Sequence, residues 1–409
     1  MRRTRVCAPI IAALAAAELA ARLLTPRPPA PAPDPVDLGS HFSPEEIERG
    51  ARFARPQLKL ALARGALDAG ALAAIVYRRP RALRDLPASP AGGAVAAAGL
   101  GLALSLPSLP LAVVARRRAV AVGLITQSWR GWAVDLVKAN AIQSAFAAGA
   151  GGAVVALTRR YPRSWWAPAA AGSVLFGAVF AAIAPVVLDP IFNDFTPLPE
   201  GETRADVLAL AQDAGVKVGE VYAVDASRRT TAANAYVTGL GPTKRVVLFD
   251  TLLDRYNRDE VRVVVAHELA HVKGRDVPRG VVFSAIIAPA TALAVQRLSW
   301  RLSDERGTPA ALPALALAVG TVAAPIGLIG NRLSRALERR ADELSLELTG
   351  AADAFVSFER TIALQNVADL DPPRWVSTIL ATHPPTTERI GAALRYARSR
   401  RPQPSTAAT

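Results

Sequence analysis

The chain has 409 residues, of which 51% are hydrophobic, a single cysteine (Cys7) and a formal net charge of +14. One cysteine excludes an internal disulfide and a cysteine-based structural zinc site. The positive charge would fit a nucleic-acid-binding protein, but the arginines stand in short clusters beside long apolar runs, as at 116–118. That pattern is typical of loops near phospholipid headgroups, so we expect a lipid bilayer and no nucleic acid among its partners.

Seven apolar stretches run through the chain, and each could contribute a membrane span. They cover residues 8–24, 60–77, 92–115, 141–157, 166–188, 281–296 and 308–330. A span needs about 20 apolar residues, which the third, fifth and seventh stretches meet and which flanking residues must complete for the others. The first stretch could be a cleaved signal peptide, but Glu18 and Arg22 interrupt its apolar core, and we favour a retained span.

These stretches divide the chain into five parts. Residues 1–189 are expected to form about five spans, and 279–330 two further spans. Between and after them lie two polar segments, 190–278 and 331–395, and the last residues, 396–409, have the composition of a disordered tail. The arginines fall on both sides of the seven spans, so the positive-inside rule leaves the orientation open.

The first polar segment combines helices with short strands. Residues 203–217 have the spacing of an amphipathic helix, and three runs are rich in β-branched and aromatic residues. The three runs are 220–225, 234–240 and 244–250. Gly241 and Pro242 predict a turn between the last two, and 258–274 predicts a helix that ends at Gly274. The expected fold class is mainly α and polytopic, with a small α+β part.

The helix at 258–274 contains His-Glu-x-x-His, with two of the chain's four histidines. His267 and His271 are four residues apart, so they lie on one helical face and can reach one metal ion. Glu268 can hold a water at that metal and accept its proton, because zinc lowers the pKa of the water. The same pattern also occurs by chance in exposed helical turns. A metal site is therefore predicted only if the chain supplies further ligands.

Downstream segments offer those further groups. Glu338 could be the third protein ligand of a catalytic zinc, which keeps a fourth position open. Asp342 lies four residues on and could accept the N–H of a ligand histidine, for which we expect His267. His383 could stabilise an oxyanion, with Arg389 assisting. Taken singly, Glu338 and Asp342 would be an ordinary surface pair, and His383 a structural histidine.

Several segments match one known family in order. "DASRRTTAANAYVTGLGPTKRVVLFDTLL", "VVVAHELAHVKGRD", "SRALERRAD" and "NVADLDPPRWVSTILATHPPTTERI" together resemble the CAAX prenyl protease type 1 family of integral-membrane zinc metallopeptidases. Residues 186–202 and 41–55 also resemble that family, so the match runs over most of residues 41–395. This agreement is far more specific than His-Glu-x-x-His alone.

The resemblance implies a zinc metalloendopeptidase with seven transmembrane helices around a water-filled chamber and a zincin-like catalytic part. It implies one Zn²⁺ per chain, held by His267, His271 and Glu338, with Glu268 as base. Residues 190–278 and 331–395 would then be the two catalytic segments, facing the cytoplasm.

The resemblance also implies where a substrate lies. Asn234 matches a residue at the family's substrate cleft, and the strand that begins there, with Ala235 and Tyr236, could pair with an extended peptide. His383 and Arg389 match positions that steady the substrate or the transition state. Because the Ala- and Arg-rich composition is typical of bacteria, we expect a bacterial inner-membrane protein that acts on membrane-associated proteins or peptides.

One alternative belongs to another functional class. A non-catalytic membrane chamber or scaffold that binds peptides or lipids would be expected to have lost some of the metal-site residues. All of the expected positions are intact in this chain. The peptidase is therefore the leading hypothesis, and the oligomeric state stays open.

Overall fold

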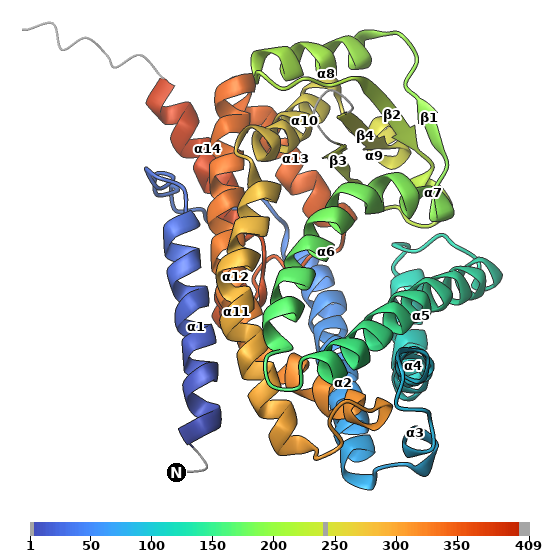
Figure 1. Cartoon of the computed structure of the whole chain (residues 1–409). Helices are drawn as coiled ribbons and strands as arrows, with labels where there is room; N and C mark the ends of the chain where they lie inside the picture. Colours follow the sequence, from blue (N-terminus) through green and yellow to red (C-terminus); the bar gives the residue numbers. More distant parts are fainter. Residues whose placement is uncertain (1–3, 240–243, 401–409) are drawn as a thin grey trace, which may run out of the picture.

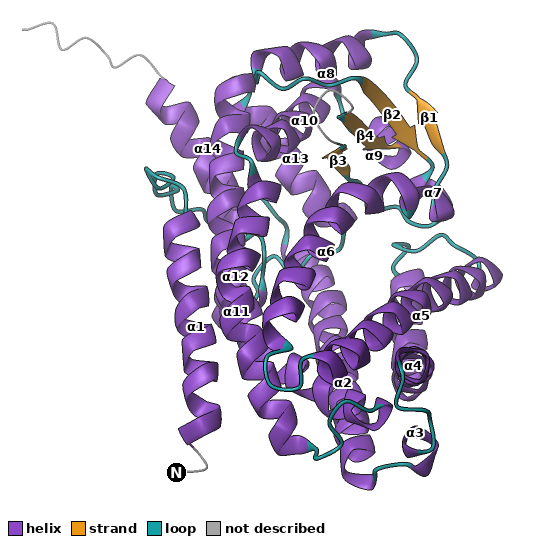
Figure 2. Ribbon diagram, viewed as in Figure 1, coloured by secondary structure: helices purple, strands orange, loops and turns teal. Residues whose placement is uncertain are grey.

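Seven long helices dominate the protein in the computed structural model, which describes residues 4–239 and 244–400 (Figure 1, Figure 2). Within those ranges, seven helices are long and apolar enough to cross a membrane. They are α1 (Thr4–Leu24), α2 (Pro44–Arg78), α4 (Pro90–Ala121), α5 (Trp129–Arg160), α6 (Trp166–Val187), α11 (Asp276–Leu302) and α12 (Leu312–Thr349). The predicted polytopic, mainly α fold with seven spans is confirmed.

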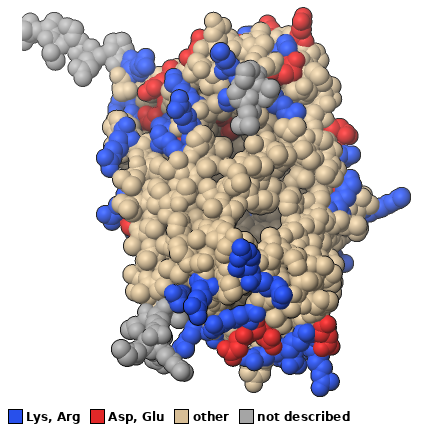
Figure 3. All heavy atoms as spheres, in the orientation of Figure 1, with Lys and Arg blue, Asp and Glu red and all other residues tan. Residues whose placement is uncertain are grey.

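A wide, largely uncharged band separates two charged ends of the molecule. Lys and Arg side chains gather above and below this band on the face that Figure 3 shows. The hydrocarbon core of a bilayer is about 30 Å thick and tolerates few charges, so this surface fits a multi-pass membrane protein. Several helices extend beyond the predicted apolar runs, since α2 begins at Pro44 and α12 continues to Thr349.

Helix α1 packs against α11 and α12 through a face of small residues. Ala13 and Ala17 are fully buried in that contact, and small side chains let helices in a membrane approach closely. Glu18 pairs with Arg22 on its own helix and with Arg332 on α12, at 2.5 and 2.7 Å. This packing is compatible with the prediction that the first span is retained, which stays a prediction.

Four short strands form a mixed sheet at one end of the bundle (Figure 2). They are β1 (Phe195–Pro197), β2 (Glu220–Val224), β3 (Ala235–Thr238) and β4 (Arg245–Phe249), in the order β1-β2-β4-β3. β2 and β4 are parallel, and the other pairs are antiparallel. Three of these strands were predicted; β1 was not. The predicted turn at Gly241 and Pro242 lies outside the described residues.

The two polar segments, far apart in sequence, join into one unit around this sheet (Figure 1). The shorter helices are α3 (Arg81–Arg84), α7 (Asp189–Phe192), α8 (Glu202–Asp213), α9 (Asp250–Arg255), α10 (Arg258–Lys273), α13 (Ala352–Gln365) and α14 (Thr386–Arg400). Leu210, Val246 and Leu269 of the first segment share one core with Phe355 of the second. The site described below sits where this unit meets α12.

The C-terminal boundary differs from the prediction. Helix α14 continues to Arg400, and Tyr396 is only 7% exposed because it packs in the same core as Phe355. The disorder expected from residue 396 is therefore wrong for residues 396–400, while 401–409 lie outside the described residues. The helix expected at 203–217 is also shorter and ends at Asp213.

Glycines bring α4 and α5 into close contact, and this makes a test of the bundle. A Cβ on Gly93 would lie 2.7 Å from the Gly151 carbonyl oxygen. We expect Gly93→Ala to lower stability by about 1–3 kcal/mol, as overpacking does, read as a lower thermal midpoint in detergent. Gly99→Ala on the same helix meets no atom within 4 Å and should leave the midpoint unchanged or raised. Equal midpoints for the two variants would contradict the packing.

Candidate metal centre

Helix α10 is held in place by its own cap and by α12. Asn257 and Glu260 form a capping box, in which each side chain accepts the other's backbone N–H, at 3.0 and 2.9 Å. Ser345 of α12 donates a hydrogen bond to the Val263 carbonyl at 2.8 Å. These contacts fix α10 against α12 in the turns where His-Glu-x-x-His lies.

Three side chains from α10 and α12 converge on one point. The Nε2 atoms of His267 and His271 lie 3.1 Å apart, and the Glu338 carboxylate lies 3.3 Å from the first and 3.6 Å from the second. Two nitrogens each about 2.1 Å from one tetrahedral ion would be about 3.4 Å apart. The structure therefore brings the three predicted ligands together in a group that could hold a metal ion.

The Glu338 carboxylate supports that interpretation independently. The residue is 7% exposed, and its Oε2 accepts no hydrogen bond from the part of the chain that the structure describes. A buried, ionised carboxylate costs free energy unless a cation or a set of donors compensates it. A cation between Glu338 and the two imidazoles would supply that compensation, so the residues present fit a metal.

Both histidines are oriented with Nε2 toward this point. His267 Nδ1 lies 2.9 Å from Asp342 Oδ1, and His271 Nδ1 lies 2.8 Å from Asp276 Oδ2. A proton on Nδ1 that is donated to a carboxylate leaves the Nε2 lone pair for a metal. Asp342 stands where the sequence analysis expected it. Asp276, at the start of α11, was missed, although it follows His271 by only five residues.

Glu268 faces a cavity of about 780 Å³ that opens beside the metal centre. Burial raises the pKa of the Glu268 carboxyl, and the two histidines oppose this effect. A raised pKa brings a carboxylate closer to the proton affinity that a base needs near neutral pH. His271 lines the cavity next to Glu268, whereas Ala178, Ala181 and Pro185 of α6 contribute an apolar wall.

His383 stands at the mouth of the site. Its Nε2 lies 3.5 Å from Glu338 Oε2, and its side chain is 63% exposed. The preceding turn, Val376–Leu380, is held by the buried Arg335, which donates hydrogen bonds to two carbonyls of this region, one of them that of Ala381, at 2.5 Å each. This anchoring to α12 places the imidazole beside the metal ligands and open to the solvent.

The three expected substrate-binding residues do not share one environment. Tyr236 lines the cavity, and its hydroxyl donates to Asp189 at 3.2 Å. Ala235 is 2% exposed, so only its backbone could contact a peptide. Asn234 is exposed just before β3, and its side chain accepts the Ala235 N–H at 3.0 Å. β3 is the last strand of the sheet in the described chain, and Val237 continues it along the cavity.

A known protein family and known relatives resemble this chain in sequence. The profile of peptidase family M48 matches residues 197–397, which include β2, β3, β4, α10 and Glu338. Over 300 residues, covering 71% of this chain and 70% of the relative, the chain is 31% identical to the uncharacterized metalloprotease YhfN of Bacillus subtilis. The chain belongs to peptidase family M48. Members of this family are metal-dependent proteases, and this chain is a metalloprotease.

The expected resemblance to CAAX prenyl proteases is also confirmed. The chain is 32% identical over 229 residues to the CAAX prenyl protease 1 homolog of Arabidopsis thaliana, a match that covers 53% of each chain, so it spans about half of that relative. The crystal structure of S. mikatae Ste24p superposes with a TM-score of 0.79 over 96% of this chain and 99% of that chain. At 19% identity, this likeness shows a shared fold.

In this M48 protease, a carboxylate and an arginine lie behind each of the two histidines that could bind a metal. Arg389 donates to Asp342 at 2.6 and 2.9 Å, and Arg340 donates to Asp276 at 2.7 and 2.8 Å. The sequence analysis expected Arg389 beside an oxyanion. In the structure the Arg389 side chain is 15% exposed and lies against Asp342, so its contacts serve the orientation of His267, and a role at an oxyanion stays a prediction.

Glu359 completes the group behind His267, and the sequence analysis missed it. It is 2% exposed and lies 2.5 Å from the Arg389 guanidinium. Burial raises the pKa of Glu359 to about 7, although the neighbouring Arg389 opposes the shift. No local motif marks this glutamate, because only the packing of α13 against α14 brings it to Arg389.

The raised pKa of Glu359 predicts a pH-dependent stability. Because the folded pKa of about 7 exceeds the ordinary value of 4.5, the protonated carboxyl stabilises the fold below pH 4.5. That contribution is lost as the pH rises from 4.5 to 7, because the unfolded carboxyl then ionises while the folded one keeps its proton. Relative to Glu359→Gln, the wild type should lose up to about 3 kcal/mol over this range, measured as thermal midpoints from pH 4.5 to 8.

A matched control removes a carboxylate on the surface, away from the buried Glu359. Glu347 of α12 is exposed, so the wild type and Glu347→Gln should lose stability in parallel with pH. A constant gap between the wild type and Glu359→Gln across the range would contradict the assignment of a raised pKa to Glu359.

Proposed function

We propose that this M48 metalloprotease is a zinc-dependent endopeptidase embedded in a membrane. The observation that carries the proposal is the convergence of two imidazole Nε2 atoms on the buried Glu338 carboxylate, whose Oε2 accepts no hydrogen bond within residues 4–239 and 244–400. Glu268 borders the adjoining cavity from the same turn of α10. This arrangement supports hydrolysis of a peptide bond by an activated water.

Zinc is the metal that the ligands favour. Two imidazole nitrogens and one carboxylate oxygen are the ligands of one class of catalytic zinc site, which keeps a fourth position open. When bound, zinc would polarise the scissile carbonyl and lower the pKa of water. His267, His271 and Glu338 would hold one ion per chain, and Asp342 and Asp276 would keep both histidines in the tautomer that binds it.

The chain's own residues then carry the proton transfers. Glu268 accepts a proton from the attacking water and delivers it to the leaving amine. His383, exposed at the mouth of the site and 3.5 Å from Glu338, donates a hydrogen bond to the oxyanion of the tetrahedral intermediate. Arg389 acts only through Asp342, as a positioning residue.

The cavity supports an extended, partly apolar peptide substrate. β3 is a sheet edge along the cavity, and edge addition satisfies the backbone of a peptide of any sequence. The small α6 residues opposite, Ala178, Ala181 and Ala182, leave room for apolar side chains. Substrates would be membrane-associated proteins or peptides. By family resemblance, we assign the protein to a bacterial inner membrane, with the catalytic part in the cytoplasm.

Glu268→Gln tests the mechanism. We expect about one zinc per chain in the wild type and the variant alike, while proteolysis of a casein or peptide-library substrate falls by about 10²–10⁴-fold, the usual contribution of a general base. Zinc is measured by elemental analysis, and Glu347→Gln is the surface control. Full activity of Glu268→Gln would rule out this base, and a wild type without zinc would favour the non-catalytic scaffold. The same variant can retain substrates for identification by mass spectrometry.

His383→Ala tests the oxyanion contact. The loss of one donor to an oxyanion lowers kcat by about 10²–10³-fold, with little change in KM or zinc content. His41→Ala removes the one histidine that lies away from the site and should leave kcat unchanged. A His383→Ala protein that loses zinc instead of kcat would show that His383 supports the metal.

A further inference from the structure

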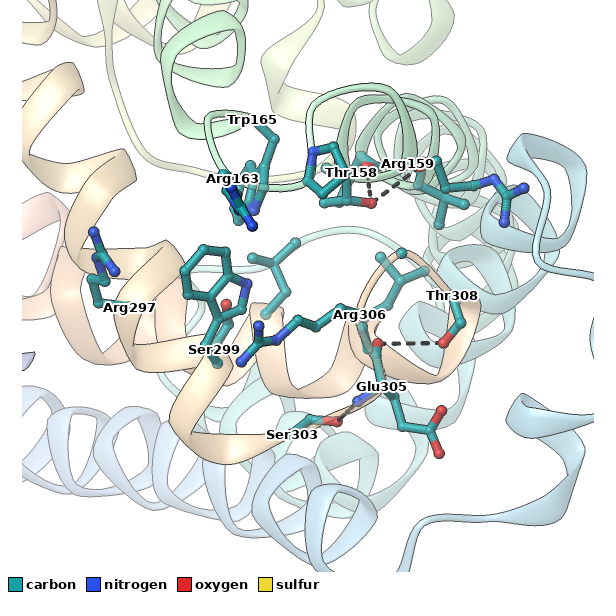
Figure 4. Close-up of a pocket in the computed structure, with 18 residues that line it drawn as sticks. Thr158, Arg159, Arg163, Trp165, Arg297, Ser299, Ser303, Glu305, Arg306 and Thr308 are labelled. Carbon is teal, nitrogen blue, oxygen red and sulfur yellow. Dashed lines mark hydrogen bonds between the residues drawn. The ribbon is translucent and has the colours of Figure 1, made fainter. Parts of the chain in front are cut away.

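A second cavity, of about 770 Å³, lies at the end of the bundle remote from the metal centre. It is formed by the turn between α5 and α6 and by the turn between α11 and α12 (Figure 4). Helix α11 starts at Asp276, beside His271, and its 27 residues span about 40 Å before it reaches this cavity. The two cavities therefore lie at opposite ends of the membrane-length helices.

Uncompensated positive charge lines this second cavity. Its lining includes four arginines, Arg159, Arg163, Arg297 and Arg306, but a single carboxylate, Glu305. Figure 4 shows Arg306 extending into the cavity, while the Glu305 carboxylate and the Arg159 guanidinium point outward. In the described part of the chain, none of the four arginines forms an ion pair with a carboxylate. An anion is the partner that this group lacks.

One tryptophan side chain, Trp300, contacts two of these arginines. The Arg297 and Arg306 guanidinium groups lie 5.4 and 4.6 Å from the centre of the Trp300 ring. Stacking on an indole face orients a guanidinium and leaves its N–H edges free for a phosphate. Trp165 is buried in the same lining. Tryptophan is enriched at the depth of lipid headgroups, which fits the position of this cavity at the ends of four candidate spans.

Aliphatic side chains also line the cavity. Val154 and Val155 of α5 and Leu312 and Leu315 of α12 stand there beside hydroxyl residues such as Ser299. A free phosphate ion would need the arginines alone, whereas a phospholipid has a charged head joined to apolar chains. The combination of unpaired arginines and aliphatic side chains at membrane depth therefore favours a lipid over a soluble anion.

We propose that this cavity binds the phosphate head group of an anionic phospholipid from the leaflet opposite the metal centre. Arg163 holds the head group from the α5–α6 turn, and Arg306 holds it from the α11–α12 turn. The bound lipid bridges two helix pairs that carry no ion pair across this cavity. The site stands on its own residues and does not depend on peptidase activity.

The test measures lipid binding to the full chain, purified in neutral detergent, by native mass spectrometry. We expect phosphatidylglycerol to bind at least tenfold more tightly than phosphatidylcholine with the same acyl chains. Arg163→Ala/Arg306→Ala should weaken phosphatidylglycerol binding by about 25-fold, since each of the two arginines near an anionic lipid contributes about 1 kcal/mol, or about fivefold. Arg160→Ala/Arg301→Ala removes the same charge from exposed neighbours that do not line the cavity and should keep binding near wild type.

Three results would overturn the proposal. One is an equal loss of binding in the two double variants, which would mean attraction to net charge alone. Another is no preference for phosphatidylglycerol over phosphatidylcholine. The third is displacement of the lipid by millimolar inorganic phosphate, which would make the ligand a soluble anion. If the double variant fails to fold by its thermal midpoint, Arg163→Gln is measured in its place. Glu268→Gln should bind lipid as the wild type does, which separates this site from the proposed peptidase.

Discussion

The contact between the Glu338 carboxylate and the two imidazoles of α10 is the constraint on which the rest of the structure depends. A carboxylate that is 7% exposed and has an oxygen without a hydrogen bond is costly unless a cation lies beside it. To bring Glu338 there, the chain must leave α10, cross the bundle in α11 and return in α12. Ser345, which bonds to the Val263 carbonyl, fixes the register of that return.

The charges behind the two histidines explain how the site is closed on one side and open on the other. Behind His267, Asp342, Arg389 and Glu359 are all buried or nearly so, and each charge meets one of opposite sign. Behind His271, Asp276 and Arg340 form a shorter chain, and both His271 and Asp276 border the cavity. We therefore expect a substrate to approach from the His271 side, while the contacts behind His267 hold its imidazole in place.

Patterns within single segments of the sequence predicted the membrane spans and the residues that share one face of a helix. The period of four in α10 and α12 identified His267, His271, Glu338 and Asp342, and continuous apolar runs identified the spans. β1 escaped prediction because three residues that include a proline carry no alternation.

Residues placed by tertiary contacts were missed for a different reason. Asp276 reaches His271 only because α11 turns back from α10, and Glu359 reaches Arg389 only because α13 packs beside α14. The end of α14 was misjudged for the same reason, since the packing of Tyr396 outweighs a polar, arginine-rich sequence.

Helix α11 lines both cavities, and α12 lines the second cavity and carries Glu338 of the metal centre, yet their packing argues against a switch between the sites. A ligand shifts a conformational equilibrium only by its differential affinity for two states. The faces of α11 and α12 that meet α1 are built on small residues such as Ala294 and Ala318, both fully buried against Ala13 and Ala17. Such contacts allow the helices to slide past one another very little, because their backbones are already closely packed. A lipid in the second cavity is therefore expected to stabilise a single arrangement of α11 and α12, and with it the distance between Asp276 and Glu338. It is not expected to shift an equilibrium between two arrangements.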